Sequence, residues 1–253
     1  MKLRAWVIVV ALAAAPPGFA ADIGAQDARD EKPSGEQQVA WKFTPTYYSS
    51  SAQVSAWDFN LRGNTDTQTA WIGYYRRQEE FSQLRLGYER PFELPSVRVV
   101  PTLQYATRGF LGASAYSEIG ERHFGVLGWG RTNLRDYYNL NFDPNDAVTF
   151  GVGTRALPNT TLTLFRILDD RLDTGQRVTH LVARIKPDAR TRWTLDAFHK
   201  EGRPDSDPAS ARVHGTGMTV TYDFDRYFVR VASDPHVNFS NDHMVRIALG
   251  MRF

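Results

Sequence analysis

Apolar and polar side chains alternate along the last nine residues of the chain, from Val245 to Phe253. Every second residue from Val245 onward is apolar, and the residues between them are small or cationic, as at Arg246 and Arg252. A period of two places these two sets on opposite faces of a β-strand. The ending therefore predicts a strand that has one apolar face and stops on the aromatic residue Phe253.

Similar runs follow one another from Val39 onward, and turn-forming segments such as GNTD at 63–66 and RPDSDP at 203–208 separate them. Regular spacing of this kind predicts an all-β antiparallel meander. We place fourteen strands at residues 39–48, 54–63, 68–77, 81–90, 96–108, 121–131, 135–143, 146–155, 160–169, 176–186, 190–200, 212–223, 226–233 and 242–253. A count of twelve stays open if a hairpin such as 39–63 is counted wrongly.

Strand length and aromatic placement favour a membrane barrel over a soluble sandwich. A tilted membrane strand needs about ten residues, whereas strands of soluble sheets typically have about five or six. Aromatic residues near the strand ends resemble an interfacial girdle; they are Trp57, Trp71, Tyr88, Tyr105, Trp193, Tyr222 and Phe253. We therefore predict a transmembrane, antiparallel, up-and-down β-barrel, closed because every backbone group in lipid needs a partner.

The lengths of the predicted connections support this topology. With both termini on one side, the four longest connections all fall at the opposite end, at 109–120, 170–175, 201–211 and 234–241. Every connection at the end that carries the termini is short. Outer-membrane barrels have this asymmetry, with short periplasmic turns and longer extracellular loops.

The final strand resembles the C-terminal strand of bacterial outer-membrane β-barrels, in which a terminal Phe after alternating apolar residues is the assembly signal. The resemblance implies a location in the outer membrane, as a monomer in contact with its lipid and lipopolysaccharide. It also implies that the barrel assembly machinery recognises Phe253, Met251 and Leu249. The resemblance identifies a class of proteins and no single family within it.

Residues 1–20 have the features of a secretory signal peptide: the cations Lys2 and Arg4, an apolar stretch up to Ala15, and small residues before Ala20. The apolar stretch is too short for a spanning helix, although an N-terminal anchor is the alternative. Residues 21–38 are polar and predict a flexible periplasmic segment. Residues 39–253 form the predicted barrel domain.

Composition removes several function classes. The chain has no Cys, which excludes disulfides, thiolate metal sites and a Cys nucleophile. Removal of residues 1–20 takes away Lys2 and Arg4 and leaves equal numbers of basic and acidic residues, which argues against a nucleic-acid partner. We find no nucleophile elbow, HExxH motif, phosphate loop or EF-hand loop, and we assign no metal and no cofactor.

The polar positions of the strands predict a charged interior in which cations outnumber acids. Its predicted members are Arg62, Arg85, Arg98, Arg108, Arg155, Arg184, Arg192, Arg246, Asp58, Glu89, Asp196 and Asp223. One interpretation is a narrow, anion-favouring channel for small solutes. The other is a closed structural barrel whose interior residues satisfy one another.

Two further interpretations involve the loops. Acidic residues in or beside the long connections could bind divalent cations or simply be solvated; they are Asp143, Asp146, Asp169, Asp170, Asp173, Glu201, Asp205, Asp207, Asp234 and Asp242. A lipid- or lipopolysaccharide-modifying hydrolase on the same scaffold would use His236 and Ser240, a base and a hydroxyl in one loop. An accessory barrel that docks an export partner through its loops is a third alternative.

Overall fold

The computed structural model describes residues 39–78, 81–138, 143–207 and 209–253. The predicted signal peptide and the segment 21–38 lie outside these ranges. In the described chain the strands are β1 Ala40–Ser50, β2 Ser55–Asn64, β3 Thr69–Arg77, β4 Phe81–Glu89, β5 Phe92–Leu94, β6 Val97–Ala106, β7 Phe110–Gly120, β8 His123–Thr132, β9 Ala147–Leu157, β10 Thr160–Asp169, β11 Arg177–Ile185, β12 Thr191–Gly202, β13 Val213–Phe224, β14 Tyr227–Asp234 and β15 Met244–Arg252, with a short 3-10 helix, η1, at Val237–Phe239.

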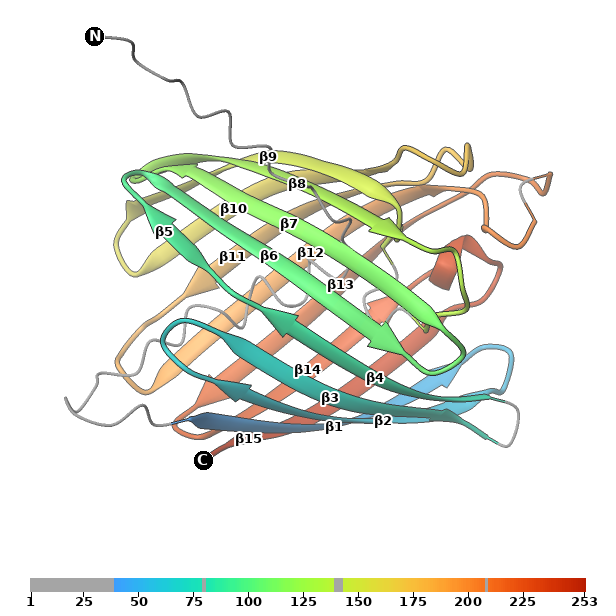
Figure 1. The fold of residues 1–253 in the computed structure, drawn as a ribbon, viewed down its shortest axis with the longest axis horizontal. Helices are drawn as coiled ribbons and strands as arrows, with labels where there is room; N and C mark the ends of the chain where they lie inside the picture. The colour runs from blue at the N-terminus through green and yellow to red at the C-terminus, as the bar shows by residue number, and fades with distance from the viewer. Residues whose placement is uncertain (1–38, 79–80, 139–142, 208) are drawn as a thin grey trace, which may run out of the picture.

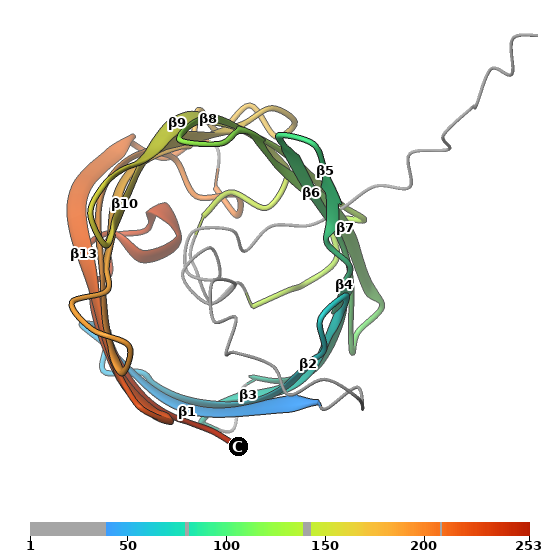
Figure 2. The same ribbon diagram turned by 90° about the vertical axis from the view of Figure 1, so that its left-hand side faces the viewer.

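Fourteen of these strands close into one antiparallel ring (Figures 1 and 2). β1 pairs with β15, with Lys42 opposite Arg252, and β4 pairs with β6. The three-residue β5 lies outside the ring and extends the sheet along β6 (Figure 1). The predicted closed, all-β barrel of fourteen strands is confirmed. Within the described ranges, no helix is long and apolar enough to span a bilayer.

The period of two produces a wall with two different faces. In β15, Ile247 and Leu249 are 47% and 57% exposed on the outer face, whereas Arg246 and Ala248 are buried on the inner face. This is the register that the C-terminal alternation predicts. Trp71 departs from the predicted girdle because it lies on the inner face beside Gly87, where a Cβ atom would come within 2.1 Å of the indole ring.

The prediction is wrong over residues 109–143. Residues 110–120, predicted as a loop, form β7, and the segment predicted as a strand at 135–143 has no strand in its described residues. Small residues such as Ala113 and Ser114 weaken the alternation of β7, and a tight turn with positive φ at Arg108 and Gly109 leads into it. The added strand β7 and the missing strand at 135–143 leave the total at fourteen. β8 lies between them, so it is the one described strand that runs opposite to its predicted direction.

The connections differ in length between the two ends of the barrel. At the end that carries β1's first residue and Phe253, here called the terminus end, the turns include two-residue connections at 121–122 and 225–226. At the opposite end, here called the loop end, the connections include 133–146 and 203–212. The predicted asymmetry is confirmed, although the longest connection is 133–146 and not 109–120.

Candidate functional site: the barrel interior

The inner face of the wall carries paired charges. Arg62 donates to Glu89 at 3.1 Å, and Arg85 pairs with Asp58. Asp223 accepts from Arg192 at 3.3 Å and also pairs with Arg252. Most of the residues that alternation predicts for the interior are buried there: Asp58, Arg62, Arg85, Glu89, Arg184, Arg192, Asp196, Asp223 and Arg246. Such pairing offsets much of the cost of burying each charge.

Three other predicted interior residues lie nearer the ends of the barrel. Arg98 is half-buried and bonds to Glu93 of β5 at 2.9 Å. Arg155 pairs with Glu118 and lies 4.0 Å from the centroid of the Phe124 ring. Arg108 is exposed in the turn after β6, where its guanidinium lies over the ring of Phe81.

The described residues 133–138, which follow β8, enter the barrel (Figure 2). Neutral groups hold this segment against the wall. Gln83 donates to the carbonyl of Asp136 at 2.7 Å and accepts from the Tyr138 backbone N–H at 2.9 Å. The Tyr138 ring stacks on Tyr75 with centroids 3.6 Å apart, and Tyr137 stacks on Phe110. Burial raises the pKa of the Tyr138 phenol above its usual value, so the stacked ring stays neutral.

The same connection is held on the other side of the interior by an ionic contact. His180 faces Asp143 through Nε2 at 3.2 Å and Asp196 through Nδ1 at 3.0 Å. The imidazole also stacks on Phe165, with an interplanar angle of 6°. An imidazolium that donates to both carboxylates satisfies this arrangement.

The second inward element is η1, which follows β14 (Figure 2). Lys200 pairs with Asp234 and donates to the carbonyl of His236 at 3.4 Å. Phe239 is buried with its ring centroid 5.4 Å from the Lys200 ammonium. Alternation from Asp196 places Lys200, four residues later on β12, on the inner face as well. It is not among the predicted interior residues, because Lys200 is the last residue of the predicted strand.

The acidic loop residues do not form one exposed rim. Asp143, Asp146 and Asp234 are buried, and Asp146 accepts from Arg171 and from the Thr132 hydroxyl, both at 2.6 Å. Among the described residues, no group of three or more His, Asp and Glu side chains has the arrangement of a metal site. Their carboxylates instead fasten connections to the wall.

The structure places His236 and Ser240 in the η1 connection without joining a base to a hydroxyl. His236 Nδ1 contacts the main-chain oxygen of Ser240 at 2.9 Å. The Ser240 hydroxyl accepts from the Asp242 N–H at 3.0 Å. Nucleophilic catalysis needs a base within reach of the hydroxyl, so the described contacts do not support the hydrolase alternative.

A closed antiparallel barrel with an apolar outer face, a charged inner face and inward-folded connections is the architecture of the bacterial outer-membrane β-barrels, and the chain has this fold. Among solved structures it is similar to the Acinetobacter baumannii outer membrane protein Omp33, with a TM-score of 0.56, 9% identity, and coverage of 87% of this chain and 100% of that one. No protein-family model and no curated protein sequence matches the chain.

Two weaker likenesses are to other porins. A mutant of the Rh. blastica porin has a TM-score of 0.47 and 9% identity, with coverage of 86% of this chain and 100% of that one. The KdgM porin, in complex with disordered oligogalacturonate, has a TM-score of 0.47 and 7% identity, with coverage of 85% and 99%.

Proposed function

We propose that the protein is an outer-membrane channel that favours small anionic solutes and is narrowed by η1 and by the described residues of the 133–146 connection. The observation that carries the proposal is a set of three interior cations that keep partial exposure, whereas the interior acids are buried. Asp58, Glu89 and Asp223 are buried in ion pairs, whereas Lys42, Arg230 and Arg252 keep partial exposure. Cationic side chains along a pore lower the barrier for anions.

The partly exposed cations gather around one ring near the terminus end. Lys42, Arg252 and Arg230 lie 4.8, 5.2 and 5.9 Å from the centroid of Phe228. Phe228 is itself buried over Gly250, where a Cβ atom would come within 1.8 Å of the ring. The aromatic platform holds three cations together, and this cluster is the anion-attracting element of the proposed channel.

Conductance of the purified, refolded protein in planar bilayers tests the proposal. We expect small conductance steps and a reversal potential that shows anion preference in a salt gradient. Lys42→Gln with Arg230→Gln should lower that preference, because both charges face the interior. Arg76→Gln is the matched control, since Arg76 is exposed on the outer face of β3 at the loop end. Silent bilayers would instead favour the closed structural barrel, for which the two fastened connections are the supporting observation.

We infer also that the C-terminal strand is recognised during assembly, as its resemblance implies. Phe253 is 61% exposed and exchanges backbone hydrogen bonds with Trp41 at 2.8 and 2.9 Å. Its side chain therefore remains available on the outer face while its backbone helps to close the barrel. Deletion of Phe253 should leave less protein in the outer membrane and more in the periplasm, measured by fractionation; normal outer-membrane levels would contradict the inference.

A further inference from the structure

The outer face of β10 to β13 carries a band of polar residues near the loop end. Arg166, Thr179, His199 and Thr216 lie opposite one another on successive strands. Arg177, Glu201 and His214 form the next row. The corresponding row on the outer face of β1 to β4, also near the loop end, contains one cation and two aromatic rings. Its members are Tyr47, Trp57, Arg76 and Ser82.

One carboxylate serves two guanidinium groups in this band. Glu201 pairs with Arg177, and the nearest Arg166 nitrogen, Nη2, lies 3.7 Å from the same carboxylate oxygen. Arg166 Nε is buried and has no hydrogen-bond partner among the described residues. Both arginine side chains are 41% exposed. The band therefore holds more positive charge than its single acid neutralises.

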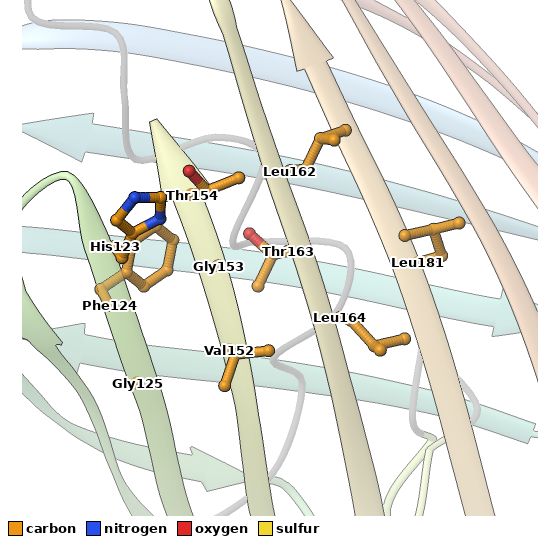
Figure 3. A pocket seen from close by; sticks show the side chains of 10 residues that line it. All are labelled: His123, Phe124, Gly125, Val152, Gly153, Thr154, Leu162, Thr163, Leu164 and Leu181. Atoms are coloured by element: carbon orange, nitrogen blue, oxygen red, sulfur yellow. The ribbon is translucent and has the colours of Figure 1, made fainter. Parts of the chain in front are cut away.

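An apolar groove adjoins this band on its terminus side. It has a volume of ≈ 580 Å³, and Gly125, Val152, Leu162, Leu164 and Leu181 line it from the outer face (Figure 3). Val152 and Leu181 are 62% and 54% exposed, while Phe124 and Thr163 beneath them are buried. Leu164 and Leu181 lie two residues from Arg166 and Thr179 on the same strands, so groove and band are continuous.

We propose that this surface binds a phosphorylated, acylated lipid of the outer leaflet, with a phosphate on Arg166 and Arg177 and an acyl chain in the groove. Guanidinium groups bind phosphate through paired N–H donors, and an apolar groove of this kind holds an acyl chain by van der Waals packing. The lipopolysaccharide anchor has both groups and lies in the leaflet that the loop end meets. The inference rests on the proposed outer-membrane location and on the orientation that the connection lengths predict, with the loop end outside, and not on conduction.

The test uses the full refolded barrel in detergent micelles with diphosphoryl hexa-acyl lipid A as the probe, and native mass spectrometry measures retained lipid. Arg166→Gln should weaken lipid A retention about tenfold, the effect of one charge-assisted hydrogen bond. Gly125→Leu should weaken it similarly by filling the groove; a Cβ atom there meets only the Ile119 carbonyl, at 3.9 Å, so the fold accepts the side chain. Arg76→Gln is the matched control and should leave retention unchanged.

Two probes separate the contributions of phosphate and acyl chain. Inorganic phosphate should not compete with lipid A, and phosphatidylcholine should bind more weakly and be insensitive to Arg166→Gln. Unchanged lipid A retention in both Arg166→Gln and Gly125→Leu, or an equal loss in Arg76→Gln, would overturn the proposal. Conductance of the same proteins keeps the two proposals apart, because a silent barrel that retains lipid A refutes only the channel.

Discussion

The outer and inner faces of the barrel wall are built from the same strands but are organised by different rules. On the apolar part of the outer face the side chains meet lipid, so the depth of a residue in the membrane sets the cost of changing it. On the inner face each charge depends on a partner from another strand or loop, as Arg85 does on Asp58 and His180 on Asp143. The stability cost of a single substitution on the outer face should therefore depend on the depth of the residue in the membrane. On the inner face it should depend on the charged partner that is left without its counter-charge.

The largest expected effect is on an inner pair. Arg85→Met leaves the Asp58 carboxylate buried without its cation, which costs about 3–5 kcal/mol of unfolding free energy. Asp58→Leu combined with Arg85→Met should recover most of that loss, because it removes both charges. Urea unfolding in detergent measures the unfolding free energy of Arg85→Met, Asp58→Leu and the double variant. A loss in the double variant equal to the sum of the two single losses would contradict the dependence of inner residues on their partners.

The outer face should respond by depth instead. Leu249→Arg places a cation among lipid tails and should cost ~2–4 kcal/mol, whereas Val245→Arg, nearer the loop end of the same strand, should cost about 0–1 kcal/mol. Both positions are exposed on the outer face. Folding free energies measured in lipid bilayers give the comparison. A larger cost at Val245 than at Leu249 would reverse the assigned depth.

Two contacts hold the 133–146 connection inside the barrel, one ionic, between Asp143 and His180, and one neutral, between Tyr138 and Tyr75. Their removal tests how inner residues depend on their partners. His180→Phe keeps an aromatic ring beside Phe165 but removes the contacts to both Asp143 and Asp196, and should cost about 1–3 kcal/mol. It should also raise single-channel conductance, because the connection is released on one side. Tyr138→Leu, which releases the neutral fastening to Tyr75, is the parallel variant. If neither variant alters conductance, the connection does not limit the channel.

The smallest effect concerns a turn at the terminus end. The Thr191 hydroxyl, with the backbone N–H groups of residues 190 and 191, lowers the pKa of Asp188. Folding therefore favours the ionised carboxylate, so its contribution to stability is present at neutral pH and is lost as pH falls through the lowered value. Asp188→Asn should lower the unfolding midpoint slightly at pH 7, with a smaller difference in acid. A constant difference at every pH would show that ionisation has no part in it.

The sequence predicts the outer face better than the inner one, and the reason is physical. Apolar alternation reports contact with lipid directly, which is why Ile247 and Leu249 could be assigned from spacing alone. The inner face follows by parity, which assigned Asp58 and Arg62 to it, and both side chains are buried in the structure. Their partners could not be predicted, because each pair joins strands whose relative register a single sequence does not state.

The segment from 109 to 143 shows where alternation itself misleads. β7 contains Gly112, Ala113 and Ser114, whose small side chains give a weak period. Tyr137 and Tyr138 continue an apparent strand pattern, yet their rings stack on Phe110 and Tyr75 inside the barrel. Burial of the Asp143 carboxylate was equally unpredictable, since its partner His180 lies 37 residues away.

The seam between β1 and β15 has a consequence for folding kinetics. Apart from β4 with β6, across the short β5, and this seam, neighbours in the ring are consecutive strands, so the sheet can grow by local hairpins. The seam joins Lys42 to Arg252 and is the contact of greatest sequence separation in the described barrel. Contacts between distant residues carry the largest loop-closure entropy and form slowly. Closure of this seam is therefore the expected late step, and until it occurs the growing sheet has two open edges, one near each end of the chain.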